Sequence, residues 1–365
     1  MKICIIGGGI NGLCCAWVLA QKGHHIDLYE RDKLVSQTSQ ASSKLLHGGL
    51  RYLEHGSFRL VREALKERDA WLKRVPSLTN PIRLVLPIYT HSSRRRWIIK
   101  TGLFLYDHLA GSSDLPPSKW LSADTLKQRD PTLKTDGLIG GYEFSDGQMD
   151  DYELGLWVAD KAKNTGCQLY EQTTVTKINK QGTVFFDDKN KQYDHIVNVA
   201  GPWVNQLLEN SQLKSHYQIE AIKGSHLIVN KTCYQSYLFE VPNEKRIFFV
   251  LDWKGKTLIG TTEIKQSLND EIKCSEEEKN YLLNAYNAYH HDPINNDDIY
   301  KSFAGLRPLV NTSTEDQLNP SQISREYAIE QTGKITTVFG GKWTTALALA
   351  NKVVQQIPLN SNKRP

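Results

Sequence analysis

The sequence predicts an α/β fold, in which a Rossmann-like domain carries an inserted domain built on an antiparallel sheet. Three observations lead to this prediction. Residues 3–6 form an apolar run that leads through a glycine cluster into a helical pattern, which is the beginning of a βαβ unit. Residues 217–264 carry several strand-like segments in succession, as in an antiparallel meander. The apolar segment 336–339 and the helical pattern after it return the chain to the first domain.

The elements between these landmarks follow from hydrophobic periodicity. Residues 57–75 repeat apolar side chains at helical spacing and predict an amphipathic helix. The strand expected at 82–89 contains Pro87, which favours a sheet edge because proline has no N–H to donate to a neighbouring strand. The other expected helices are 11–21, 94–110, 151–166, 275–290 and 343–357, and the other expected strands are 25–29, 169–178, 182–187, 194–200, 225–229, 246–251 and 257–261.

The composition is ordinary for a globular protein, with 39% hydrophobic and 23% charged residues. The net charge of +5 suits an anionic substrate or a membrane surface, but it is too small and too dispersed to predict nucleic-acid binding. The six cysteines show no CxxC pair and no zinc-ligand spacing, so we expect reduced thiols, a cytoplasmic protein and no metal site. We expect neither a signal peptide nor a transmembrane helix, since no run of about 18 apolar residues occurs.

Residues 7–12 carry the pattern GxGxxG between the first expected strand and the first expected helix. Gly7 suits a tight turn, Gly9 lets the backbone approach a pyrophosphate, and Gly12 lets the helix pack on the strand. The helix N-terminus offers N–H groups and the positive end of its dipole. Glu30, at the end of the second strand, can accept hydrogen bonds from a ribose diol. The motif therefore predicts a dinucleotide site, which disfavours NADP and leaves FAD and NAD open.

Residues 38–56 concentrate polar chemistry just after this βαβ unit. The segment reads TSQASSKLLHGGLRYLEHG and combines hydroxyls, cations, two imidazoles and a Gly–Gly pair. A structural loop has no need of that mixture, whereas a site that holds an anion beside a redox cofactor does. We therefore predict that the segment contacts both a cofactor and an anionic substrate.

The chain resembles the FAD-dependent glycerol-3-phosphate dehydrogenases, within the broader group of flavoprotein oxidoreductases that includes D-amino acid oxidase. The resemblance runs over residues 2–356, with its segments in the same order. These segments are IGGGING (6–12), SSKLLHGGLRYLEHGSFRLVREALKER (42–68), GLFLYDHLAG (102–111), YEFSDGQMDD (142–151), NVAGPW (198–203), KGSH (223–226), LIGTTE (258–263), GLRPL (305–309), SREY (324–327) and FGGKWTT (339–345).

This resemblance implies non-covalent FAD and the oxidation of sn-glycerol 3-phosphate to dihydroxyacetone phosphate, with electrons passed to a quinone. Two alternatives stay open. One is an FAD-dependent oxidase of the same fold that acts on another small hydroxy or amino acid, with oxygen as acceptor. The other is a flavin-binding protein that has lost its activity. Relatives of this kind usually carry a helical C-terminal domain, which we expect to be missing here, so the oligomeric state stays open.

The resemblance also implies a division of the chain. We expect the FAD-binding domain to be discontinuous, with the substrate (cap) domain inserted into it. The FAD-binding domain takes residues 1–80, 140–215 and 300–358, the substrate domain takes 81–139 and 216–299, and residues 359–365 form a tail.

Most of the implied cofactor contacts come from glycine-rich turns and from the polar segment. Val175 is expected on a strand near the adenine, and the helix after Gly340 and Gly341 is expected to point its N-terminus at the N1–C2=O edge of the flavin. The expected cofactor contacts are Gly7, Gly9, Ile10, Asn11, Gly12, Glu30, Arg31, Thr38, Ser42, Ser43, Lys44, Leu46, His47, Gly48, Gly49, Val175, Ala200, Gly201, Gly305, Gly340, Gly341, Lys342, Trp343 and Thr344.

The implied substrate site needs a cationic clamp for a phosphate and a base for a hydroxyl proton. The expected clamp consists of Arg51, Arg307 and Lys342 with Arg325 behind them, and Tyr52, Thr261 and Thr262 add neutral hydrogen bonds. Arg307 is also counted among the catalytic residues. The candidate bases are His47 and His226, because an imidazole can titrate near neutral pH. His47 is preferred because it adjoins the Gly48–Gly49 turn.

The expected helix at 94–110 begins with three arginines and has a wide apolar face. Such a helix suits contact with anionic lipid headgroups, although a buried helix with a basic end explains the same pattern. The first interpretation places the protein on the cytoplasmic face of the membrane as a peripheral protein.

Overall fold

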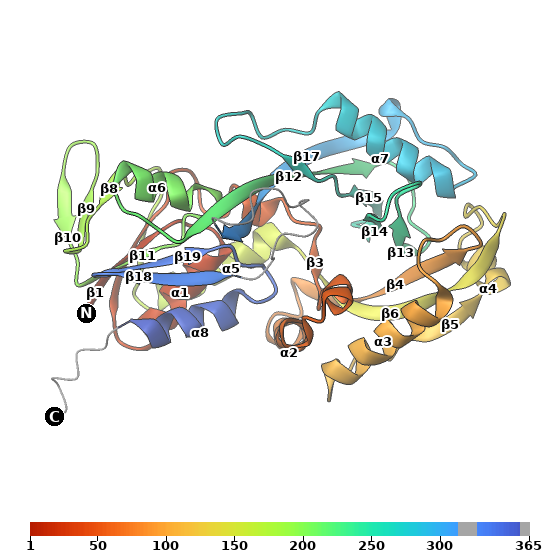
Figure 1. The fold of residues 1–365 in the computed structure, drawn as a ribbon, viewed down its shortest axis with the longest axis horizontal. Helices are drawn as coiled ribbons and strands as arrows, with labels where there is room; N and C mark the ends of the chain where they lie inside the picture. The colour runs from red at the N-terminus through yellow and green to blue at the C-terminus, as the bar shows by residue number, and fades with distance from the viewer. Residues whose placement is uncertain (313–326, 358–365) are drawn as a thin grey trace.

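The computed structural model describes residues 1–312 and 327–357, and two large sheets organise them (Figure 1). The first sheet has six strands in the order β18-β19-β11-β1-β2-β7. Its pairs are parallel except for β18, which joins the edge antiparallel to β19. The strands are β1 (Lys2–Ile6), β2 (His25–Tyr29), β7 (Gln168–Tyr170), β11 (His195–Asn198), β18 (Ala328–Thr332) and β19 (Ile335–Phe339).

Three helices pack together beside this sheet: α1 (Ile10–Gln21), α5 (Asp151–Asn164) and α8 (Ala346–Gln356). The central strand β1 is buried from Ile3 to Ile6, because a parallel sheet is covered on both faces and selects continuous apolar runs. On its other face the smaller sheet of β8 (Lys177–Ile178), β9 (Thr183–Phe185) and β10 (Asn190–Gln192) and helix α6 (Val204–Asn210) contribute to a second apolar cluster.

The second sheet has ten strands, eight of them in the order β16-β12-β15-β14-β13-β4-β6-β3, with β17 paired to β12 and β5 paired to β6. All pairs are antiparallel except β4 with β13. The strands are β3 (Leu45–Leu46), β4 (Thr79–Tyr89), β5 (Lys119–Ser122), β6 (Leu138–Met149), β12 (Tyr217–Val229), β13 (Ser236–Glu240), β14 (Ile247–Trp253), β15 (Lys256–Gly260), β16 (Ile264–Lys265) and β17 (Ile299–Thr312).

Alternation along these strands separates two apolar clusters on the two faces of the sheet. Val85, Tyr237 and Phe239 belong to the cluster that includes residues of α4 (Ala123–Arg129) and α7 (Glu276–Tyr289). Leu84 and Leu238 belong to the other cluster, which includes residues of α2 (Phe58–Arg74) and α3 (Arg96–Ala110). The short 3-10 helices are η1 (Thr38–Gln40), η2 (Leu50–His55), η3 (Gly201–Trp203) and η4 (Asn296–Asp298).

The predicted fold class is confirmed, but three local predictions are wrong. The strand with Pro87 is not an edge strand, because β4 lies between β13 and β6. Strand β13 pairs only with Leu84 and Val85, so this pairing ends before the proline. Residues 169–178 do not form one strand, since β7 ends at Tyr170 and β8 begins at Lys177. The last helix begins at Ala346 and not at residue 343.

The proposed domain boundaries and the boundaries of the two large sheets do not coincide at two strands. Strand pairing places β6 and β17 in the ten-stranded sheet, although the proposed boundaries put most of both strands in FAD-binding segments. No helix in the part of the chain that the structure describes is both long and apolar enough to cross a membrane.

Candidate active site

Two cavities meet where the two large sheets approach each other. The first, of about 360 Å³, lies at the carboxyl ends of β1, β2 and β11, which is where open α/β sheets bind ligands. The second, of about 550 Å³, lies against the ten-stranded sheet. Five residues line both cavities, so one extended ligand can occupy them together: Thr38, Pro308, Gly341, Lys342 and Trp343.

The glycines of the GxGxxG motif shape the first cavity. Gly7 has φ +114°, and a Cβ there would lie 2.6 Å from the Val199 carbonyl oxygen. Gly9 also lines the cavity. Gly12 does not line it, and a Cβ at Gly12 would lie 1.9 Å from the Gly7 carbonyl oxygen. Gly12 therefore serves the close packing of α1 on β1, and only the other two glycines can approach a ligand.

Glu30 and its neighbours form the polar wall of the first cavity. One Glu30 oxygen accepts a hydrogen bond from the Gly8 N–H at 2.6 Å and the other accepts one from the Asp32 N–H at 2.8 Å. The guanidinium of Arg31 lies over the Trp203 ring, 4.4 Å from its centroid. A fixed carboxylate has lone pairs left for a diol, so this wall suits a ribose.

Four more predicted cofactor contacts line the first cavity: Ile10, Asn11, Ala200 and Gly201. The Oδ1 of Asn11 is buried and has no hydrogen-bond partner within residues 1–312 and 327–357. Val175 also lines this cavity, but it does so from the loop between β7 and β8 and not from a strand. A buried amide oxygen without a partner is costly, which is a reason to expect a ligand there.

The second cavity brings together both candidate bases. His47 and His226 line it, as do the predicted contacts Ser42, Ser43, Gly49, Gly305 and Thr344. The His226 ring is stacked on Phe303, and its Nε2 lies 2.8 Å from the Ser43 hydroxyl. Its Nδ1 is buried and has no hydrogen-bond partner among the described residues. Burial, together with the positive charges of Lys44 and Arg307, holds the pKa of His226 well below its usual value.

Three of the predicted cations also line the second cavity: Arg51, Arg307 and Lys342, accompanied by Tyr52 and Thr261. Arg307 donates from Nη2 to the Thr262 carbonyl oxygen at 2.6 Å and from Nη1 to Glu263 at 3.2 Å. The Lys342 ammonium lies 3.9 Å from the centroid of the Tyr52 ring. Arg325 lies outside the described residues.

Several predicted contacts point elsewhere. Lys44 is buried in an ion pair with Asp151, with 2.6 Å between Nζ and Oδ1, and lines neither cavity. Thr262 donates to Glu278 at 2.6 Å. The contacts predicted for Lys44 and Thr262 stay predictions, and in this structure both side chains are bonded to a carboxylate of the chain itself. Leu46, Gly48 and Gly340 also line neither cavity.

Sequence reasoning missed several residues at the site. The Ser39 hydroxyl accepts a hydrogen bond from the Ile10 N–H at 2.9 Å, at the beginning of α1. Trp203 lines the first cavity, and Glu263 and Asp146 line the second. The signal was present for Trp203, Glu263 and Asp146, since all three lie in segments that carry the resemblance. The sequence-based prediction considered cations and bases and did not include the acids that orient them.

Comparison with known proteins settles the family. The profile described as "FAD dependent oxidoreductase" matches residues 2–351. The chain belongs to this family. FAD is accordingly the cofactor of this FAD-dependent oxidoreductase, and the two connected cavities fit it. The first of them has glycine turns, a carboxylate held by backbone N–H groups and a buried amide oxygen that has no partner among the described residues.

Its relatives include dehydrogenases of two polyol phosphates. The aerobic glycerol-3-phosphate dehydrogenase of Escherichia coli is 37% identical, over 97% of this chain and 72% of its own. The D-erythritol 1-phosphate dehydrogenase of Brucella abortus is 36% identical, over 97% of this chain and 72% of its own. The solved glycerol-3-phosphate dehydrogenase of Bacillus halodurans, complexed with FAD, has a TM-score of 0.77 at 26% identity. That match covers 97% of this chain but only 64% of the solved chain, so this chain spans less than two thirds of it.

Proposed function

We propose that this FAD-dependent oxidoreductase oxidises sn-glycerol 3-phosphate to dihydroxyacetone phosphate and passes the electrons to a quinone. One observation carries the proposal: three cations and two imidazoles line a single cavity that joins the dinucleotide cavity. Dehydrogenases of glycerol 3-phosphate among the relatives support the same substrate. The proposal gives each group of residues one task.

The cations bind the phosphate end of the substrate. Arg51, Arg307 and Lys342 come from three distant segments of the chain and line the same cavity. Guanidinium groups match phosphate oxygens in pairs, and an ammonium adds a compact charge. Arg307 is held in place by Glu263, whose other oxygen lies 3.3 Å from Nε of Arg246. A clamp oriented in advance binds a dianion with less loss of side-chain entropy.

An imidazole accepts the hydroxyl proton of the substrate. FAD, when bound, supplies the acceptor for the hydride that leaves the carbinol carbon. His226 is kept neutral because its pKa is lowered, and a neutral imidazole can take up a proton. In the tautomer in which Nε2 donates to the Ser43 hydroxyl, Nδ1 has a free lone pair and can accept the proton. His47, the base preferred from the sequence, lines the same cavity and is the other candidate.

The proposed quinone acceptor is supported by the apolar part of the second cavity. Leu84, Phe144, Leu238 and Phe249 lie side by side on paired strands and line the cavity. A wall of aromatic and aliphatic side chains suits the planar apolar ring of a quinone, and it offers no hydrogen bonds to a polar electron acceptor.

The proposed membrane contact is supported by the exposed side of α3. Trp97 and Phe104 are 63% and 69% exposed, and Ile98 is exposed beside them. Arg95 and Lys100 are exposed on the same segment. Exposed aromatic side chains among cations suit the interface of a membrane with anionic lipids.

An anaerobic titration of the purified holoenzyme with sn-glycerol 3-phosphate tests the substrate. The proposal expects stoichiometric bleaching of the oxidised flavin absorbance and catalytic reduction of a quinone analogue. D-erythritol 1-phosphate is tested in parallel, since a dehydrogenase of this substrate has almost the same identity to the chain. Bleaching only by another substrate, or peroxide formation in place of quinone reduction, contradicts the proposal.

Sedimentation with vesicles tests the membrane contact. The protein is expected to sediment with vesicles that contain phosphatidylglycerol and to stay in solution with purely zwitterionic ones. Trp97→Ala and Phe104→Ala should each weaken binding to the vesicles roughly ten- to 150-fold, because burying an aromatic side chain contributes roughly 1.5 to 3 kcal/mol. Tyr300→Ala is the matched control, since Tyr300 is 62% exposed and lies on β17. Equal effects of all three variants would rule out α3 as the contact.

A further inference from the structure

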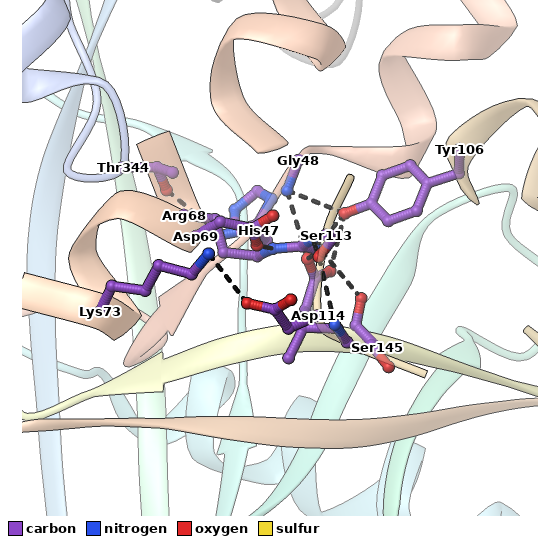
Figure 2. Close-up of polar contacts among 12 residues, drawn as sticks. His47, Gly48, Arg68, Asp69, Lys73, Tyr106, Ser113, Asp114, Ser145 and Thr344 are labelled. Carbon is purple, nitrogen blue, oxygen red and sulfur yellow. Dashed lines mark hydrogen bonds and ion pairs between the residues drawn. The ribbon is translucent and has the colours of Figure 1, made fainter. Parts of the chain in front are cut away.

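A chain of buried polar groups lies behind the Gly48 turn (Figure 2). The Gly48 N–H donates to the Tyr106 hydroxyl at 2.8 Å, and that hydroxyl donates to Asp146 at 2.7 Å. Arg68 donates to the same Asp146 oxygen at 3.1 Å and is only 2% exposed. Hydrogen bonds in such a chain strengthen one another in a dry environment.

The turn packs so closely against these groups that no side chain fits at Gly48. A Cβ at Gly48 would lie 2.5 Å from a Leu65 methyl carbon and 2.7 Å from the Tyr106 hydroxyl oxygen. The peptide between His47 and Gly48 is therefore pressed against α2 and α3. Because a trans peptide directs its N–H and C=O to opposite sides, the bond to Tyr106 also sets the direction of the His47 carbonyl.

Helix α2 holds a second segment of the site in the same way. Trp71, one turn after Arg68 and fully buried, donates from its indole nitrogen to the Thr344 carbonyl oxygen at 3.1 Å. The Thr344 hydroxyl accepts a hydrogen bond from the His47 N–H at 3.2 Å, so the two segments also touch each other (Figure 2). One face of α2 thus holds two segments that come from opposite ends of the sequence.

The burial of the ion pair between Arg68 and Asp146 needs a reason other than stability. A buried pair of charges contributes little net stability, because desolvation offsets the attraction between them. Helix α2 also carries one member of a contrasting pair: Lys73 lies 2.8 Å from Asp114, which follows α3, and their side chains are 66% and 78% exposed (Figure 2). The exposed pair contacts neither segment of the site, whereas the buried pair is joined to Gly48 through Tyr106.

We propose that Arg68, Asp146 and Tyr106 are positioning residues that hold the His47–Gly48 peptide against the cofactor. They act on the cofactor through the backbone, and Asp146 itself lines the second cavity. Burial raises the pKa of Asp146 to about 6, against the opposing effect of Arg68, so its charge depends on the partners that surround it. Loss of the Tyr106 hydroxyl removes the shorter of the two hydrogen bonds of the Gly48 N–H and leaves its longer one, of 3.4 Å, to Asp146. It removes neither charge.

The Tyr106→Phe holoenzyme tests the proposal. Phenylalanine keeps the edge-to-face contact with Phe144 and removes only the hydroxyl. One lost hydrogen bond to the turn should raise the dissociation constant of FAD about fivefold and shift the flavin absorption bands. Release of flavin on heating should move to lower temperature by more than the unfolding of the protein does. Lys73→Ala, on the exposed pair, should leave all three measurements unchanged.

Two further outcomes decide the matter. Wild-type affinity for FAD and a wild-type flavin spectrum in Tyr106→Phe would overturn the proposal, as would equal shifts of flavin release and protein unfolding. Asp146→Asn is expected to have a larger effect than Tyr106→Phe, because it also removes the more deeply buried of the two carboxylates that pair with Arg68. If Asp146→Asn does not fold, Arg68→Lys replaces it. Lysine keeps the charge but loses the planar guanidinium, which donates from Nη1 to Asp146 and the Ser145 carbonyl oxygen and from Nε to Asp69.

Discussion

Replacing Arg307 with alanine tests the proposed phosphate clamp most directly. The guanidinium lines the second cavity and is fixed by Glu263 and by the Thr262 carbonyl. Glu263 keeps its ion pair with Arg246 in the variant, so the truncation does not leave that carboxylate without a cation. The measured effect is therefore dominated by the substrate contact and not by damage to the fold.

The size of the effect follows from one charge-assisted contact to the phosphate. Such a contact contributes about 1.5 to 3 kcal/mol, and each 1.4 kcal/mol is tenfold, so kcat/KM should fall roughly ten- to 150-fold. Steady-state dye reduction with glycerol 3-phosphate measures this loss. Glycerol, which lacks the phosphate, should be oxidised equally slowly by both proteins.

The comparison of the two substrates can refute the reasoning. An equal loss with glycerol and with glycerol 3-phosphate would mean that Arg307 supports the fold or the cofactor and does not bind phosphate. An unchanged kcat/KM for glycerol 3-phosphate would remove Arg307 from the clamp altogether. Lys231→Ala is the control, because Lys231 is a cation paired with Asp292 and lines neither cavity.

Three other predictions concern stability and cofactor binding. Asp151→Ala should lower the free energy of unfolding by about 3 to 5 kcal/mol in urea, because it leaves the buried Lys44 charge unpaired, whereas Lys254→Ala, at an exposed pair, should cost less than about 1 kcal/mol. Glu30→Gln should weaken FAD binding about tenfold in an ultrafiltration assay, since an amide has one acceptor oxygen in place of two; unchanged binding would exclude the ribose contact. The pKa of His226 is lowered in the folded state. As pH falls below about 6.5, only the unfolded imidazole takes up a proton, so the free energy of unfolding decreases. His226→Gln should make this decrease shallower by about 1.4 kcal/mol per pH unit.

The first βαβ unit could be predicted because its signals are local. A short apolar run, a glycine cluster and an acid after the next strand lie within residues 3–30, and each constrains the backbone nearby. The edge prediction for Pro87 failed because the position of a strand in its sheet is decided by distant partners. Strand β13, which covers β4, is more than a hundred residues away in the sequence and pairs with only two of its residues.

The candidate site was predictable in its cations and histidines but not in the groups that hold them. Lys44 belongs to a segment typical of anion binding, yet its partner Asp151 lies 107 residues away and turns it into a buried structural ion pair. Glu263 and Asp146 line a cavity that is expected to bind an anion, and the sequence gives no reason to expect acidic side chains there. Their roles follow from distances to Arg307 and Arg68, and those distances exist only in the folded chain.

The long pair formed by β12 and β17 has a mechanical consequence. Their antiparallel register runs from Tyr217 with Thr312 to Val229 with Ile299, and the pair extends from the six-stranded sheet, where both strands contact β19, across the ten-stranded sheet (Figure 1). A two-stranded ribbon of this length resists bending. It differs in this from the single-chain linkers that usually act as hinges between domains. We therefore expect substrate to enter through local motion of loops at the mouth of the cavity, and not through a hinge motion that separates the two sheets.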